Sequence, residues 1–259
     1  MNMSEPEIIK NNSAGRLVKV LHEIAIQQQP SAYIISSVKS VIKIKTQDKN
    51  CIDYYSLLLK SIFKIEEELI IIPEQKRLNY LHTLKELKKI ILKLSINSSY
   101  KWRNVEEAFK NTKSYIFRDL ENMAYDISEY KSDEKIENRE LEKIQKEVSN
   151  LINKIRTIKI DKELKFILLE KLNKIEKLID NYELWGSDAI KNELEDIVKK
   201  IMFCDSNKIS SDEDKNFVLM VLDWVFKTLS ALSATKNILP EGSVEMFNKL
   251  KNNILPPGN

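Results

Sequence analysis

Residues that favour turns are rare in this chain. Only 4 of its 259 residues are glycine and 6 are proline. Because sheet folds need a turn after each short strand, this scarcity argues against sandwiches, barrels and doubly wound sheets. Apolar residues instead recur at intervals of three and four along nearly the whole chain, which predicts amphipathic helices. We therefore expect an all-α fold, a multi-helix bundle of about nine or ten helices.

The most regular apolar pattern lies in the middle of the chain. Apolar residues are spaced alternately three and four apart along 141–158 and again along 168–179, with Asp161 as the expected cap between them. Two such helices joined by a short link fold back on each other, which predicts a central antiparallel coiled-coil-like hairpin at 134–181. We call the apolar residues of 141–158 and 168–179 the seam. The seam either packs within the chain or binds a partner. The candidate partner-binding residues on it are Leu141, Ile144, Val148 and Leu151.

Polar stretches suggest where helices begin and where the chain divides. Ser13 is a candidate N-cap for the first helix. The polar residues at 130–135 are the best candidate for a hinge, which predicts an N-terminal helical bundle over 1–132 and a C-terminal helical region over 133–259. One continuous domain is the alternative. In the N-terminal part, helices are predicted at 14–28, 31–45, 49–71, 74–95 and 103–130.

The stretch NYELWGSDAIKNELEDIVKKI, residues 181–201, contains the only glycine between positions 15 and 242. Gly186 suits a backbone position with positive φ, and Ser187 suits the N-cap of the helix that follows. Trp185 either packs over the entry to that helix or is exposed as an anchor for a partner. In this stretch an aromatic residue is followed by a glycine and then by an acidic helix with periodic leucines. This order resembles a pattern in uncharacterised all-helical bacterial proteins encoded near mobile-element and phage-defence genes. The resemblance carries over no site residue.

The stretch FVLMVLDWVFKTLSALSA, residues 217–234, is predicted to form a helix that is apolar on all sides. Such a helix is buried either in protein or in lipid. Its length reaches the lower bound for crossing a bilayer. Asp223 and Lys227 lie near its middle, however, and charged residues there disfavour insertion. We expect a core helix, and a membrane-inserting segment is the alternative.

Both histidines of the chain follow an arginine at short spacing, Arg77 before His82 and Arg16 before His22. This spacing resembles the Arg-x4–6-His signature of helical ribonucleases of the HEPN type, which implies Arg77 and His82 as the alternative catalytic pair. Residues five apart on a helix point about 140° apart, so the two side chains diverge within one chain. Sites of that type are built across two chains, and a dimer would be needed to bring the groups together.

The remaining motifs point away from most enzyme classes. The four glycines cannot form a phosphate-binding loop, and the sequence contains no Gly-x-Ser-x-Gly or His-Glu-x-x-His motif. We expect no cofactor and no metal. No basic stripe accompanies the net charge of +3, so nucleic acid is not the expected partner. Two isolated cysteines and a polar N-terminus predict a cytoplasmic protein.

The leading hypothesis is therefore a non-enzymatic helical interaction protein, a scaffold, adaptor or regulator that binds another protein or itself through helices. The resemblance at 181–201 implies a bacterial antiviral defence system as its setting. The alternatives are a metal-independent HEPN-like ribonuclease acting as a dimer and a membrane-acting effector that uses 217–234.

Overall fold

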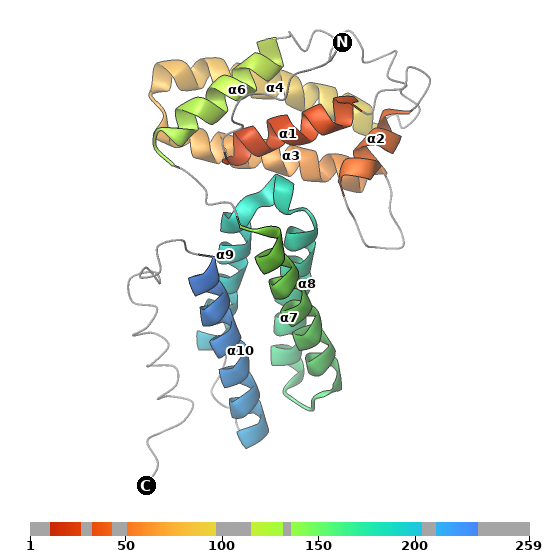
Figure 1. Ribbon diagram of the computed structural model, residues 1–259, viewed down its shortest axis with the longest axis vertical. Helices are drawn as coiled ribbons and strands as arrows, with labels where there is room; N and C mark the ends of the chain where they lie inside the picture. Colours follow the sequence, from red (N-terminus) through yellow and green to blue (C-terminus); the bar gives the residue numbers. More distant parts are fainter. Residues whose placement is uncertain are drawn as a thin grey trace. The chain divides into compact units, whose positions relative to one another are not determined.

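The computed structural model describes residues 11–26, 33–42, 51–96, 115–131, 136–203 and 211–232. Over these ranges the chain forms nine α-helices and one short 3-10 helix, and it forms no strand (Figure 1). The predicted all-α helical bundle is confirmed. The part of the predicted helix 103–130 that precedes residue 115 lies outside the described residues.

The chain divides into two compact units that interleave along the sequence. The N-terminal unit comprises residues 1–133 together with 180–186, and the C-terminal unit comprises 134–179 together with 187–259. The predicted division after residue 132 lies one residue before the point at which the chain first passes from the N-terminal to the C-terminal unit. Residues 180–186 were predicted to belong to the C-terminal region, but they pack in the N-terminal unit because Leu184 enters its hydrophobic core. We call 180–186 the return segment.

Four helices of the N-terminal unit form a closed ring of contacts. Helix α1 (Ser13–Ile26) contacts α3 (Cys51–Glu68), which contacts α4 (Glu74–Ile96), which contacts α6 (Tyr115–Ser128), which returns to α1. The short helix α2 (Ile34–Val41) packs on α1, and the 3-10 helix η1 (Leu69–Ile71) joins α3 to α4. Each ring helix contributes fully buried apolar side chains, so the unit has a core of its own. Among them are Leu17, Ile62, Leu84 and Leu120.

The start of α1 is fixed by side chains from distant parts of the N-terminal unit. Asn12, rather than the predicted Ser13, caps the helix: its Oδ1 accepts a hydrogen bond from the backbone N–H of Gly15 at 3.0 Å. The Nδ2 of Asn12 donates to the carbonyl of Ala124 at 2.6 Å. Ser13 instead donates from its hydroxyl to the buried carboxylate of Glu68 at 2.9 Å. Both residues suit a cap, and these tertiary contacts decide between them.

The C-terminal unit is built from α7 (Asn138–Thr157), α8 (Lys162–Asp180), the part of α9 (Tyr182–Met202) that follows Gly186, and α10 (Asp212–Ala231). Side-chain bonds join neighbouring helices of this unit. Ser149 of α7 donates to Glu176 of α8 at 3.0 Å. Lys171 of α8 forms ion pairs with Glu193 and Asp196 of α9. These bonds surround an apolar interior made by the regular stripes of each helix.

Helix α10 differs from the helix expected at 217–234. Its residues Val218, Val221, Leu222 and Val225 are fully buried, but Asp223 and Lys227 lie on an exposed face and pair with each other at 2.6 Å. The expectation of an apolar surface on all sides was therefore wrong. Among the described residues, no helix has both the length and the apolar character needed to cross a membrane.

Gly186 divides α9 into two helical segments. Its φ of 68° and ψ of −175° lie in a region that essentially only glycine occupies. A Cβ atom at this position would lie 2.5 Å from Cζ of Arg16, whose side chain is buried in the N-terminal unit. The backbone conformation favours a residue without a side chain, and a Cβ atom would in addition force the buried guanidinium of Arg16 to move. The positive φ expected at Gly186 is confirmed.

The first prediction concerns this glycine. We expect Gly186→Ala to destabilise the N-terminal unit by about 2 kcal/mol because it combines backbone strain with a clash against Arg16. Gly186→Asn should be equally harmful, since asparagine tolerates the left-handed helical region but not this one. Urea unfolding followed by circular dichroism measures the effect, with Lys146→Ala on the exposed side of α7 as control. Wild-type stability of Gly186→Asn would contradict this account.

A second prediction concerns the pair formed by Lys171 and Asp196. The hydrogen bond from Lys171 lowers the pKa of the Asp196 carboxyl below its ordinary 3.8, and the same bond raises the pKa of Lys171 above 10.5. The Asp196 contribution is therefore present above its unfolded pKa and is lost as the pH falls through the folded pKa. The Lys171 contribution is lost only as the pH rises through its raised pKa.

We expect the urea midpoint of the wild-type protein to fall more steeply than that of Asp196→Asn between about pH 5 and about pH 3. Glu142→Gln, an exposed change on α7, is the control and should keep the wild-type slope. Equal acid sensitivity in the wild type and Asp196→Asn would show that the pair does not contribute.

Candidate functional site: a groove between α7 and α10

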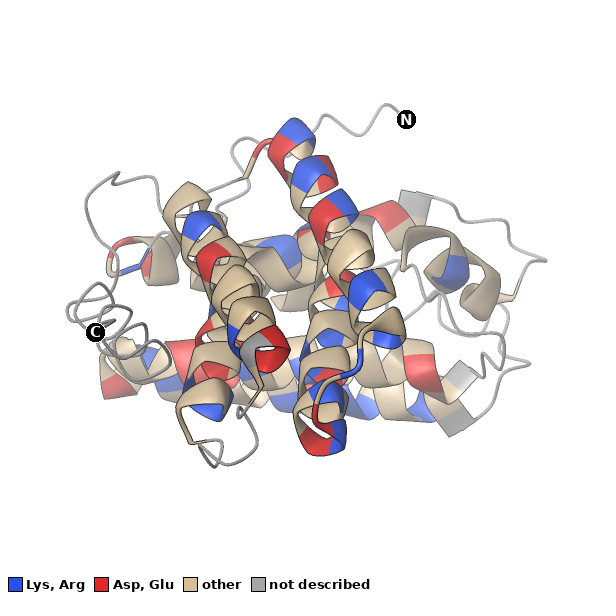
Figure 2. Ribbon diagram, turned by 90° about the horizontal axis from the view of Figure 1, so that it is seen from below, with Lys and Arg blue, Asp and Glu red and all other residues tan. Residues whose placement is uncertain are grey.

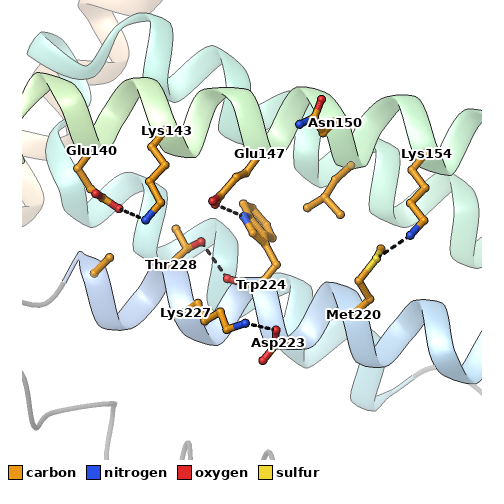
Figure 3. A pocket seen from close by; sticks show the side chains of 12 residues that line it. Glu140, Lys143, Glu147, Asn150, Lys154, Met220, Asp223, Trp224, Lys227 and Thr228 are labelled. Atoms are coloured by element: carbon orange, nitrogen blue, oxygen red, sulfur yellow. Dashed lines mark hydrogen bonds and ion pairs between the residues drawn. The ribbon is translucent and has the colours of Figure 1, made fainter.

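A groove of about 430 Å³ runs between α7 and α10 of the C-terminal unit (Figure 3). Its apolar part is formed by Leu151, Met220 and Trp224. Charged residues from both helices line it as well. They are Glu140, Lys143, Glu147 and Lys154 from α7 and Asp223 and Lys227 from α10. The two helices present these residues at spacings of three and four, so each contributes one face to the groove.

Trp224 is the central side chain of the groove. Its indole Nε1 donates a hydrogen bond to Oε2 of Glu147 at 3.0 Å, which joins α10 to α7. The residue is 8% exposed, so most of the ring is packed in the unit and only an edge reaches the surface. The backbone carbonyl of Trp224 also accepts a bond from the hydroxyl of Thr228 at 2.9 Å. Both polar groups of this residue that could bond a ligand are thus satisfied within the protein.

Four of the six charged residues of the groove form ion pairs with each other. Lys227 contacts Asp223 at 2.6 Å, and Lys143 contacts Glu140 at 3.3 Å. The ammonium group of Lys154 lies 2.9 Å from the sulfur of Met220. The lining carries three acidic and three basic side chains, so it has no formal net charge. Basic and acidic residues are likewise interleaved along the helices in Figure 2. Such a groove offers no strong field to a polyanion.

The lining residues do not form a catalytic arrangement. Among them are no histidine, cysteine or serine, and the single hydroxyl group, that of Thr228, donates to a carbonyl of its own helix. A nucleophile needs a general base within hydrogen-bond reach, and the groove residues supply no such pair. Within the described part of the chain, no three or more His, Cys, Asp or Glu side chains are grouped to hold a metal ion.

The predicted partner-binding residues of the seam lie inside the C-terminal unit. Leu141, Ile144, Val148 and Leu151 are 0–8% exposed. Only Leu151 also lines the groove. Their burial favours packing within the chain over contact with a partner. Trp185 is half-buried against the core of the N-terminal unit, and its carbonyl accepts a bond from Lys64 at 3.3 Å. This placement favours a packing role for Trp185 as well.

The structure places the arginine–histidine pairs in separate environments. The guanidinium of Arg77 lies 3.5 Å from the carbonyl of Ile70, while His82 is exposed on α4. Arg16 is buried beside Gly186. His22 is partly buried, its ring contacts Phe117 edge to face with ring centres 5.0 Å apart, and its Nε2 lies 3.9 Å from Oε1 of Glu121. Arg16 and His22 therefore make their contacts within the N-terminal unit.

No protein-family model, curated protein or solved structure matches this chain.

The sequence did not identify the groove in advance. Groove residues recur every three to four positions on α10, at Met220, Trp224, Lys227 and Ala231. In the sequence this spacing predicts a helix but not a groove. The exposed pair of Asp223 and Lys227 was the available signal, because two charges one turn apart define a solvent-facing side. Which helix borders that side depends on tertiary packing.

The third prediction tests the bond between Trp224 and Glu147. Replacing Glu147 with leucine leaves the indole N–H without its acceptor, and we expect a loss of about 1–2 kcal/mol in the free energy of unfolding. Glu147→Gln keeps an acceptor oxygen and should lose less than half as much. Urea unfolding measures both, with Glu142→Leu on the exposed side of α7 as the matched control. Equal losses for the glutamine and leucine variants would show that the hydrogen bond is not the cause.

Proposed function

We propose that this protein is a non-enzymatic interaction protein, an adaptor or regulator, whose α7–α10 groove binds an amphipathic helix of a partner protein. The observation that carries the proposal is the groove itself, with its apolar strip between two rows of charged side chains. A helix that lays an apolar stripe into such a groove is a recurring mode of recognition. Charged residues beside that stripe would then meet the mixed charges of the two rows.

The length and polarity of the groove favour a helix over a small molecule. The lining of α7 extends from Glu140 to Lys154, about 21 Å of helix at 1.5 Å per residue. That is enough for about four turns of a bound helix. Sites for small molecules usually present a few polar groups that converge on the ligand. Here the polar groups bond one another, so an occupant would gain mainly from apolar contact.

The two alternative functions have less support. A HEPN-like ribonuclease needs Arg77 and His82 to converge, whereas Arg77 contacts the carbonyl of Ile70 and His82 is exposed. A membrane-acting effector needs α10 to leave the C-terminal unit, where Val218, Val221 and Leu222 are fully buried. The resemblance at 181–201 adds the proposal that the partner belongs to a bacterial antiviral defence system.

The fourth prediction is tested by photo-crosslinking in the cells from which the chain comes. A photoreactive amino acid at Asn150, an exposed residue in the groove lining, should crosslink to a discrete partner protein. The same amino acid at Phe166, which is 68% exposed on α8 outside the groove, is the matched control. Met220→Glu, which places a charge in the apolar strip, should reduce the crosslinked product by about tenfold.

Two outcomes would contradict the proposal. One is equal crosslinking at Asn150 and Phe166, or none at either. The other is cleavage of RNA by the purified protein in EDTA that disappears in His82→Ala, which would favour the ribonuclease instead.

A further inference from the structure

Helix α3 and its extension η1 carry an exposed apolar stripe that the proposed function does not use. Ile52, Phe63 and Ile70 are 62%, 52% and 68% exposed. They are 11 and 7 residues apart, and both spacings return to within about 20° of the same direction on a helix. Large apolar side chains aligned on one exposed face mark an interaction surface more strongly than scattered ones do.

Two charged residues flank the middle of this stripe. Lys60 lies three residues before Phe63 and Glu67 lies four residues after it, and both are exposed. On a helix, both positions lie within about 60° of the direction of Phe63. Along the helix axis, the stripe therefore has a positive side chain three residues toward the N-terminus from Phe63 and a negative one four residues toward the C-terminus. Neighbouring Glu66 is already paired with Lys88.

This arrangement complements a second copy of itself. When two identical helices lie antiparallel and cross at Phe63, Lys60 of each lies beside Glu67 of the other on the same lateral side, offset along the axis by one residue, about 1.5 Å. The contact is self-complementary, as a two-fold interface requires, and it forms two ion pairs around a central pair of aromatic rings. Ile70 of one copy would lie opposite Ser56 of the other, where a short side chain leaves room for it. A different protein docking on this surface would not require opposite charges placed about Phe63 in this way.

We propose that α3 is a homodimerisation surface, on which a second copy of this chain docks with its own α3 antiparallel and a two-fold axis at Phe63. The surface belongs to the N-terminal unit and is separate from the groove, which belongs to the C-terminal unit. The Nζ of Lys88 lies 4.0 Å from the centre of the Phe63 ring and holds this side chain in place on the surface of the free chain.

The fifth prediction is a charge-exchange experiment on the full chain. Sedimentation equilibrium over a range of concentrations should show a monomer–dimer equilibrium for the wild type. Lys60→Glu places two acidic residues opposite each other, and Glu67→Lys places two basic residues opposite each other. Each single variant should weaken dimerisation by about tenfold or more, because like charges then meet at two places. Lys146→Glu, an exposed change on α7, should leave it unchanged.

Two combinations separate this geometry from a general effect of charge. An equimolar mixture of the Lys60→Glu and Glu67→Lys proteins should form heterodimers, since each acidic position then faces a basic one. The double variant Lys60→Glu/Glu67→Lys should dimerise with itself. Circular dichroism confirms that every variant is folded. A monomeric wild type at all concentrations, single variants that dimerise like the wild type, or a mixture that stays monomeric would each overturn the proposal.

The dimer and the groove are tested independently. Met220→Glu should reduce crosslinking through the groove by about tenfold without changing the monomer–dimer equilibrium. Dimerisation that is lost in Met220→Glu would also overturn the assignment to α3.

Discussion

The contact between Arg16 and Gly186 is the constraint on which the architecture depends. The guanidinium occupies the space that any side chain at position 186 would need, and the backbone there adopts a conformation reserved for glycine. Two residues earlier, Leu184 enters the core of the N-terminal unit, and at Ser187 the chain continues into the C-terminal unit. A single glycine therefore allows the chain to complete one unit and to leave it within three residues.

The return segment makes the N-terminal bundle depend on residues far away in sequence. Residues 134–179 separate it from the rest of that unit, so its docking closes a long loop of the chain. Closing a flexible loop of this size would cost conformational entropy. Here α7 and α8 account for most of the loop, and residues already fixed in helices have less conformational entropy left to lose. Order within the C-terminal unit thus lowers the entropic cost of completing the N-terminal one.

Periodicity in the sequence was enough to predict the helices and the all-α class, because each helix must bury one face whatever lies against it. It was not enough to predict which faces meet. Asn12 and Ser13 are both good caps, and the choice between them rests on Glu68 and Ala124, which are remote in sequence. Trp224 looked like one more apolar residue of α10. Its role at the groove depends on Glu147, which lies 77 residues earlier in the chain.

The two surfaces differ in how their charges are satisfied, and this difference bears on what each can bind. The groove pairs four of its six charges internally, so in the proposed complex selectivity would come mainly from the fit of an apolar stripe. On α3, Lys60 and Glu67 are spaced so that an antiparallel copy pairs both, which favours self-recognition. Dimerisation through α3 would give each assembly two grooves. A partner with two suitable helices would then bind with avidity, so moderate affinity at each groove would suffice for an adaptor.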